Sequence, residues 1–172
     1  KVISDTTEVQ DFDNLFSSEP VSGYPESWIE RLKIFENEPL ALGLIKESDT
    51  SIDQLVTTRK VKQVGYGITE SEIAEAKRLG FLPATASLPK KLTKAEADKW
   101  MLTITIPTYE KQVEEIVKVP LTKAQKFALI SFCHNSGRNN LRKLVNQKDR
   151  LNDGNYLLTC AMIEKYDNAS GN

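Results

Sequence analysis

The 172-residue sequence contains few of the residues that crosslink small proteins or bind metals: two cysteines and a single histidine. Two cysteines do not make the disulfide framework of a small secreted domain. Cys133 and Cys160 both lie in helical apolar patterns, where a buried cysteine acts as a small hydrophobic residue. The histidine, His134, has no second ligand at metal-binding spacing, so a packed position is favoured over a metal site. We expect no metal and no cofactor.

An excess of one charge and long apolar stretches are also absent. Lys and Arg total 23 and Asp and Glu total 24, a net charge of -1, so no overall field favours nucleic acid or an anionic membrane. No apolar run approaches the roughly 18 residues that span a bilayer, and residues 1–20 lack the pattern of a signal peptide. We therefore expect neither a nucleic-acid partner nor a membrane partner.

The composition predicts one globular domain behind a short extension. The sequence is 40% hydrophobic and 27% charged, which suits a domain with a real core. Residues 1–25 are acidic and polar and end in Pro20, Gly23 and Pro25, which indicates an arm or linker; residues 26–172 form the domain. The chain starts at Lys1 without Met and stops at Asn172 without a closing element. We therefore expect a piece of a longer protein, with a domain that is incomplete at its C-terminus.

A helix is predicted over residues 27–38, between the capping residue Ser27 and Pro39. Its apolar residues recur at helical spacing: Trp28, Ile29, Leu32 and Phe35. Glu36 directly follows this apolar face. A carboxyl group against an aromatic wall loses solvation, so its pKa rises toward that of a general acid. The alternative, which this stretch alone favours, is that Glu36 and Glu38 only solvate the helix end.

The following segments predict a small β-hairpin and then several helices. Alternating residues over 54–67 indicate the hairpin, with Arg59 and Lys60 at its turn and Gly65-Tyr-Gly67 at its end. Capping boxes predict helix starts at Thr69 with Glu72, at Thr93 with Glu96 and at Thr122 with Gln125. The second of these helices continues through a β-branched run, and Pro107 bends or divides it. The helix over 121–135 is apolar on most faces, so we expect other helices to surround it.

These pieces follow one another in a familiar order. The order is Phe35-Glu36, then Gln63-Val-Gly-Tyr-Gly67, then Leu92-Thr-Lys-Ala-Glu-Ala97, then the stretch over 119–137. The last stretch matches the form Pro-Leu-Thr-x-x-Gln-x-x-Ala-Leu-x-Ser-Phe-x-x-Asn-x-Gly at Pro120, Leu121, Thr122, Gln125, Ala128, Leu129, Ser131, Phe132, Asn135 and Gly137. Over about residues 26–170 the sequence resembles the phage-type lysozymes. The resemblance implies an α+β lysozyme-like fold, with a small β-hairpin lobe, a mostly helical lobe and a cleft between them.

The resemblance also implies an activity and a set of site residues. It implies a glycoside hydrolase that cleaves the β-1,4 glycosidic bond of bacterial peptidoglycan. Glu36 matches the catalytic glutamate and Gln63 matches the active-site threonine, while Tyr66 and Asn135 are expected to contact substrate. Such a protein acts in a phage virion or in the host cell, in the periplasm or on the cell wall. Other virion proteins are expected to bind through residues 1–25 or through missing flanks.

The sequence departs from the family pattern at several positions. Asn37 replaces the glycine after the glutamate, Ile68 replaces the histidine after Gly-Tyr-Gly, and Thr57 stands in the register of the catalytic aspartate. The interval from Glu36 to Gln63 is also longer than usual, which indicates an insertion. Asp53 or Asp49 could supply the second carboxylate, and Asp53 is preferred because it is nearer the hairpin. Two alternatives stay open: Glu36 acts alone in a transglycosylase-like reaction, or the protein is an inactive structural or wall-binding component of a virion.

Overall fold

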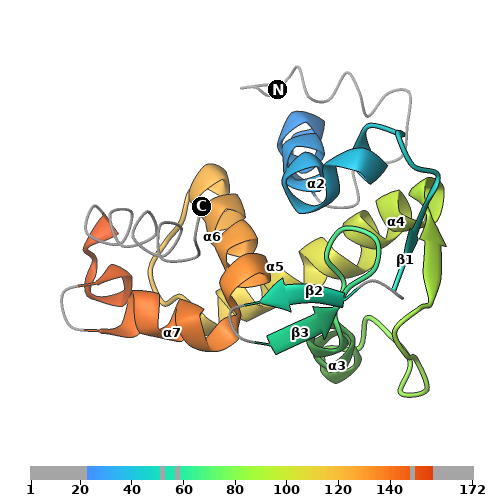
Figure 1. Cartoon of the computed structure of the whole chain (residues 1–172). Helices are drawn as coiled ribbons and strands as arrows, with labels where there is room; N and C mark the ends of the chain where they lie inside the picture. Colours follow the sequence, from blue (N-terminus) through green and yellow to red (C-terminus); the bar gives the residue numbers. More distant parts are fainter. Residues whose placement is uncertain (1–22, 51–52, 57–58, 148–149, 157–172) are drawn as a thin grey trace.

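A computed structural model describes residues 23–156 apart from 51–52, 57–58 and 148–149, and gives the backbone alone for 53–56 and 59–60. Most of the predicted arm therefore lies outside the described residues, although Tyr24 is already buried in the core. The elements are α2 (Glu26–Ala41), β1 (Glu47–Asp49), β2 (Asp53–Val56), β3 (Arg59–Lys62), α3 (Glu70–Arg78), β4 (Lys91–Thr93), α4 (Lys94–Trp100), the π-helical η1 (Met101–Thr105), α5 (Ile106–Ile116), α6 (Lys123–Ser136), α7 (Arg138–Asn146) and the 3-10 turn η2 (Leu151–Asp153). This arrangement is α+β and lysozyme-like, which confirms the predicted fold class (Figure 1).

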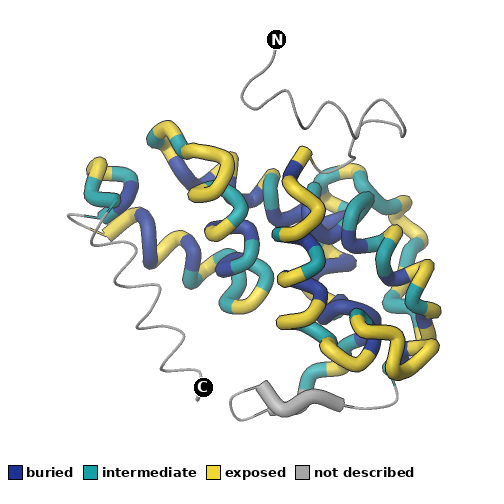
Figure 2. Tube along the Cα trace, turned by 90° about the horizontal axis from the view of Figure 1, so that it is seen from above, coloured by how far each residue is buried: buried dark blue, intermediate teal, exposed yellow. Residues whose placement is uncertain are grey.

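Helices α5, α6 and α7 pack against one another and hold much of the core (Figures 1 and 2). The buried face of α6 carries Leu129, Ile130, Phe132 and Cys133. Removing these apolar side chains from water is the main stabilising contribution of this helix. The opposite side of α6 is different from what the sequence predicts, because Ala124 and Ala128 are exposed. The prediction of a central buried helix is therefore confirmed for one face only.

Two small antiparallel sheets account for the strands. In the predicted hairpin, β2 pairs with β3 from Asp53 opposite Lys62 to Val56 opposite Arg59. Arg59 and Lys60 thus begin the second strand and do not form the turn. The second sheet pairs β1 with β4, with Ser48 opposite Leu92. The interval from Glu36 to Gln63 thus contains the end of α2, strand β1 and the two hairpin strands.

The long helical segment from Lys94 to Ile116 is divided by η1, which lies just before Pro107. The β-branched run over 103–106 is helical, as predicted. Proline lacks an N–H group and is tolerated in a first helical turn, and Pro107 occupies that position in α5. A π-helical turn widens the backbone because its hydrogen bonds span five residues and not four. Side chains five positions apart, such as Trp100 and Thr105, can then approach the same partner.

The helix starts follow the predicted caps, with one correction. Thr93 and Thr122 form complete capping boxes. Thr69 also accepts a hydrogen bond from the backbone N–H of Glu72, at 3.3 Å. The Glu72 side chain, however, does not return to Thr69; it turns into the core, where buried donors bind its carboxylate. Long-range hydrogen bonds therefore replace half of the predicted capping box.

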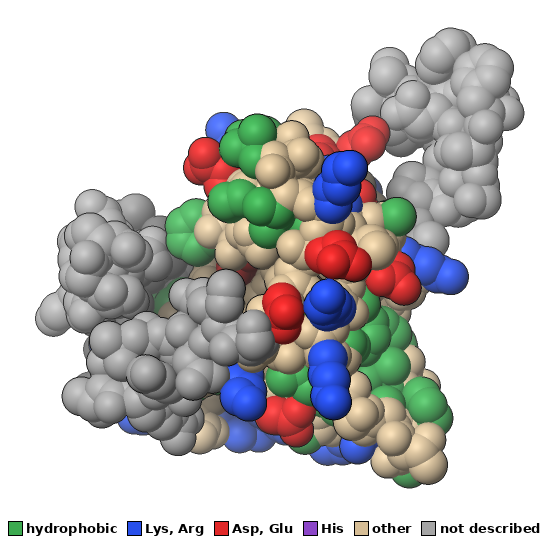
Figure 3. Space-filling model, turned by 45° about the vertical axis from the view of Figure 1, so that its right-hand side comes forward, with side chains coloured by type: hydrophobic (Ala, Val, Ile, Leu, Met, Phe, Trp, Pro, Cys, Tyr) green, Lys and Arg blue, Asp and Glu red, His purple; other side chains and the backbone are tan. Residues whose placement is uncertain are grey.

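The distribution of surface charge agrees with the low net charge. In the face shown in Figure 3, acidic and basic side chains are interspersed and no single charge dominates. Such a surface provides no strong field for steering a polyanion. Within the described residues, no helix has the length and apolar character that crossing a membrane requires.

Candidate active site

The Gly65-Tyr-Gly67 turn follows the hairpin and is bound by several elements at once. A bridge between Val64 and Ile68 closes it. The N–H of Gly65 donates to Ser48 Oγ at 2.8 Å, and the Tyr66 hydroxyl donates to Asp98 Oδ1 at 2.7 Å. Strand β1 and helix α4 therefore fix the turn from two sides.

Helix α2 brings Glu36 to this turn because the helix is interrupted directly after it. Asn37 has an extended backbone, with φ -158° and ψ 83°, and its Oδ1 accepts a hydrogen bond from the N–H of Leu40 at 3.3 Å. This contact resembles a helix N-cap, and Pro39 then lies in the first turn of the second part of α2, where proline is tolerated. The predicted stop at Pro39 is thus wrong: the break lies at Asn37, and the helix resumes to Ala41.

The side chain of Asn37 also ties the break to the turn. Its Nδ2 donates to the carbonyl oxygen of Gly65 at 2.9 Å. One amide group therefore caps the second part of α2 and holds the turn beside Glu36. Glycine, which the family pattern has at this position, could make neither bond.

The carboxyl group of Glu36 is enclosed, with 10% of its side chain exposed. Its Oε1 lies 3.6 Å from Nε2 of His134, and its Oε2 is buried without a hydrogen-bond partner among the described residues. Desolvation by burial raises the pKa of Glu36, while His134 and the side-chain amide of Asn135 act in the opposite direction. The net effect favours the protonated acid, because burial penalises the charged form most.

Gly67 allows the turn to approach this carboxyl group. Its φ is +83°, a conformation that side chains disfavour. A Cβ atom at this position would lie 2.9 Å from Oε1 of Glu36 and 3.2 Å from Nε2 of His134. Only a residue without a side chain leaves room for both groups.

A second buried carboxylate, Glu72, lies behind the site and is fully buried. Its Oε2 accepts hydrogen bonds from Trp100 Nε1 at 2.8 Å and from Thr105 Oγ1 at 2.7 Å. Trp100 directly precedes the π-helical turn η1 and Thr105 is its last residue. Burial raises the pKa of Glu72, and His134, Thr105, Trp100 and Tyr109 act in the opposite direction.

A polar cavity of about 570 Å³ lies where the start of α3 faces the end of α6 and the start of α7. His134 and Asn135, both of which act on Glu36, contribute to its lining. The other polar groups that line it include Thr69, Ser71, Arg138, Asn139 and Asn140. Amides and hydroxyls both donate and accept hydrogen bonds, so this lining suits a ligand rich in hydroxyl and amide groups.

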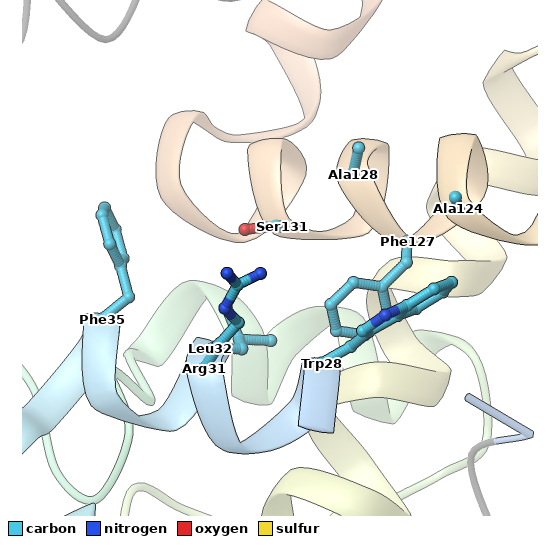
Figure 4. A pocket seen from close by; sticks show the side chains of 8 residues that line it. All are labelled: Trp28, Arg31, Leu32, Phe35, Ala124, Phe127, Ala128 and Ser131. Atoms are coloured by element: carbon cyan, nitrogen blue, oxygen red, sulfur yellow. The ribbon is translucent and has the colours of Figure 1, made fainter. Parts of the chain in front are cut away.

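A second cavity, of about 360 Å³, runs between α2 and α6 and is mainly apolar. Figure 4 shows Trp28, Arg31, Leu32 and Phe35 of α2 facing Ala124, Phe127, Ala128 and Ser131 of α6. The rings of Trp28 and Phe127 close one end, with centroids 5.6 Å apart. This groove shares no lining residue with the polar cavity, and Glu36 is not among the residues that line either one.

The structure brings some of the predicted site residues together. Asn135 lies at the end of α6 and acts on Glu36. Gln63 is half-buried between the end of β3 and the bridge that closes the Gly65-Tyr-Gly67 turn. Tyr66 as a whole is only 2% exposed, and its hydroxyl group donates to Asp98 Oδ1. Its role in substrate binding stays a prediction.

The predicted second carboxylate also stays a prediction. Asp53 begins β2 opposite Lys62, so its backbone lies at the open end of the hairpin; its side chain is outside the described part. Asp49 is exposed in β1 opposite Lys91. Thr57 lies outside the described residues.

Sequence reasoning missed two groups at this site. His134 was predicted to be a packed residue, and it is buried, but its contact with Glu36 was not foreseen. Asn37 was noted only as a departure from the family pattern. The one local signal for Asn37 is an asparagine two residues before a proline, a pattern that fits a cap. His134 has no local signal, because its partner is on another helix.

Among the described residues, no group of three or more His, Cys, Asp or Glu side chains could hold a metal ion. In a scan of protein families, residues 50–172 match the family model described as phage lysozyme. The matched region is more than half of the chain and includes the Gly65-Tyr-Gly67 turn, but Glu36 lies before it. Searches of curated proteins and of solved structures gave no match. The place of Glu36 in the site therefore depends on the contacts described above.

Proposed function

The chain belongs to the phage lysozyme family, and we propose that it cleaves the β-1,4 glycosidic bond of bacterial peptidoglycan with Glu36 as the general acid. Family membership supports a wall-acting, phage-associated peptidoglycan hydrolase. The observation that carries the residue assignment is the carboxyl group of Glu36, which is desolvated and has one oxygen without a partner among the described residues.

The two oxygens of this carboxyl group have different surroundings. Oε1 lies against Gly67 and Nε2 of His134, whereas Oε2 has no bonding partner in the described part of the chain. Oε2 is therefore the oxygen that would carry the proton. A general acid donates such a proton to the glycosidic oxygen as the bond to the sugar breaks. The raised pKa of Glu36 keeps more of the acid protonated as the pH approaches neutrality.

The polar cavity supports a saccharide substrate. Peptidoglycan sugars carry hydroxyl and N-acetyl groups, and the amides of Asn135, Asn139 and Asn140 can bind both. Asn135 acts on Glu36 and also lines this cavity, so a sugar bound there would lie next to the acid. In this proposal, Gln63 faces the same bond from the hairpin.

A second ionised group would stabilise positive charge on the sugar or position the attacking water. We assign this role to Asp53. Its backbone lies at the open end of the hairpin, where it pairs with Lys62, the neighbour of Gln63. If no aspartate takes the role, Glu36 could act first as acid and then as base, as in a transglycosylase.

The proposal is tested with Glu36→Gln on purified peptidoglycan. The substitution keeps the shape of the side chain and removes the proton, so we expect the rate of release of soluble fragments to fall by roughly 10²- to 10⁴-fold. Glu38→Gln, an exposed position on the same helix, is the matched control and should lyse walls like the parent. Activity of Glu36→Gln within a few-fold of the parent would overturn the assignment.

The products separate the remaining alternatives. Mass spectrometry of the released fragments should show new reducing ends if water attacks, and fragments lighter by one water if the sugar closes on itself. If the parent protein binds peptidoglycan in a pull-down but releases nothing, it is a wall-binding component without turnover. We further propose that it acts in the virion or on the host wall, and that residues 1–25 contact other virion proteins.

A further inference from the structure

The contacts of His134 extend beyond those of a packed core residue. Only 2% of its side chain is exposed. Its Nε2 lies 3.1 Å from the carbonyl oxygen of Tyr66 and 3.6 Å from Oε1 of Glu36. A carbonyl oxygen can only accept a hydrogen bond, so Nε2 carries a hydrogen. This N–H group bonds the carbonyl oxygen of Tyr66, and Oε1 of Glu36 lies just beyond hydrogen-bond distance of it.

The imidazole ring is held in this orientation from two sides. On one side lies the ring of Tyr109 from α5, with centroids 4.9 Å apart and planes inclined by 43°. On the other side lies Gly67, where even a single Cβ atom would be 3.2 Å from Nε2. The ring therefore has little room to turn away from Glu36.

The charged and titratable groups around the ring come from four elements. Glu36 faces it from α2, Glu72 acts on it from α3, and Tyr109 packs on it from α5. Glu75 of α3 and Arg138 of α7 line the same cavity as His134. Nδ1 of His134 is buried without a hydrogen-bond partner among the described residues. Among the described residues, the polar contacts of this ring are therefore made by Nε2.

We propose that His134 is a positioning residue for Glu36, and that its Nε2–H holds the carboxyl group against the turn and stabilises the anion left after proton transfer. The inference rests on the proposed role of Glu36. While Glu36 is protonated, the N–H group bonds mainly to the Tyr66 carbonyl oxygen. When the proton moves from Oε2 to the glycosidic oxygen, the negative charge stays on Glu36, and Oε1 becomes the stronger acceptor.

Two substitutions separate the N–H group from the ring. His134→Phe keeps an aromatic ring against Tyr109 but removes the donor, and His134→Gln keeps an N–H donor without an imidazole. Because misplacing an acid can cost about a hundredfold in rate, we expect lysis by His134→Phe to fall by roughly ten- to a hundredfold. His134→Gln should retain a clearly larger part of the activity. Phe132→Leu, a buried neighbour on α6, controls for general damage to that helix.

A direct titration of Glu36 by carbon NMR of its carboxyl group tests the same inference without any activity. His134 lowers the pKa of Glu36 against the effect of burial. Removing it in His134→Phe should therefore raise that pKa, and the alkaline limb of the lysis profile should move to higher pH with it. Phe132→Leu should leave both unchanged. An unchanged Glu36 titration in a folded His134→Phe variant would overturn the inference.

The parent protein provides a measurement that does not depend on the folding of any variant. The ring nitrogen signals of His134 should show an inflection at the midpoint of the Glu36 titration, and its absence would also overturn the inference. If these titrations behave as expected but the parent releases no wall fragments, the contact between the two residues stands and the proposed hydrolase activity fails. The two conclusions are therefore separable.

Discussion

Two glutamates of this protein are desolvated, and they differ in what surrounds their oxygens. Glu72 is fully buried, and Trp100 and Thr105 both donate to its Oε2. Glu36 keeps 10% of its side chain exposed. Each carboxyl group has one buried oxygen without a hydrogen-bond partner among the described residues, Oε2 in Glu36 and Oε1 in Glu72. Burial raises the pKa of both. A raised pKa alone therefore does not distinguish an acid that reacts from one that holds a core together.

The difference lies in the bonds that each carboxyl group makes and in access to a ligand. The donors around Glu72 come from both ends of η1, so this carboxylate joins α3 to the α4–η1–α5 segment. No such pair of donors binds Glu36 among the described residues, and two of its neighbours, His134 and Asn135, line a cavity of about 570 Å³. We infer that Glu72 is structural and that Glu36 is available for chemistry.

The largest effect on stability is expected for Glu72→Ala, which should lower the free energy of unfolding. The substitution leaves the N–H of Trp100 and the hydroxyl of Thr105 buried without an acceptor, and each unsatisfied group costs about 1–3 kcal/mol. We expect the free energy of unfolding to fall by about 3 kcal/mol, measured by urea denaturation. Glu36→Ala should cost much less, because it leaves fewer donors unpaired. Equal losses in the two variants would break the comparison.

The sequence signals that succeeded are local ones. Thr93 and Thr122 were predicted as caps because each needs only a partner three residues away, and both form complete capping boxes. Glu36 was predicted from the apolar spacing of its helix and from its place in the family pattern; its burial agrees with this, and its catalytic role stays a prediction. The hairpin was predicted from alternation, but its turn was misplaced, because Arg59 and Lys60 continue the strand.

The signals that failed concern contacts between distant parts of the chain. Glu72 stands three residues after a threonine, which predicts a capping box, but its partners are 28 and 33 residues away. A glutamate at this helix position can bond its own N-terminus or a distant donor, and only tertiary packing decides between them. His134 was missed for the same reason, since Glu36 and Tyr66 reach it from other elements.

A third carboxylate, Asp53, extends the comparison to the hairpin. If it supplies the second ionised group, Asp53→Asn should lower the lysis rate by about tenfold or more, equivalent to about 1.4 kcal/mol of transition-state stabilisation. Its melting temperature should not change. Glu47→Gln, at an exposed position of β1, is the matched control. Full activity of Asp53→Asn would assign the second role elsewhere or leave Glu36 alone in it.

The smallest expected effect is on the pH dependence of the free energy of unfolding. Comparing the parent with Glu36→Gln at each pH isolates the contribution of Glu36. Burial raises the pKa of Glu36 in the folded state, so the folded protein binds this proton more tightly than the unfolded chain. Its contribution is fully present below the unfolded value, about 4.3, and is lost as the pH rises through the folded value.

The parent alone does not report this contribution. Glu75 and Glu115 have pKa values lowered mainly by hydrogen bonds from Arg78, so their stabilising contributions are lost as the pH falls. These opposing effects cancel when the unfolding free energy of Glu36→Gln is subtracted from that of the parent. The unfolding free energy of the parent minus that of Glu36→Gln should decrease as the pH rises above about 4.3. A flat difference, like the one expected for the exposed Glu38→Gln, would mean that Glu36 titrates as a solvated acid and would remove the main reason for assigning it the proton.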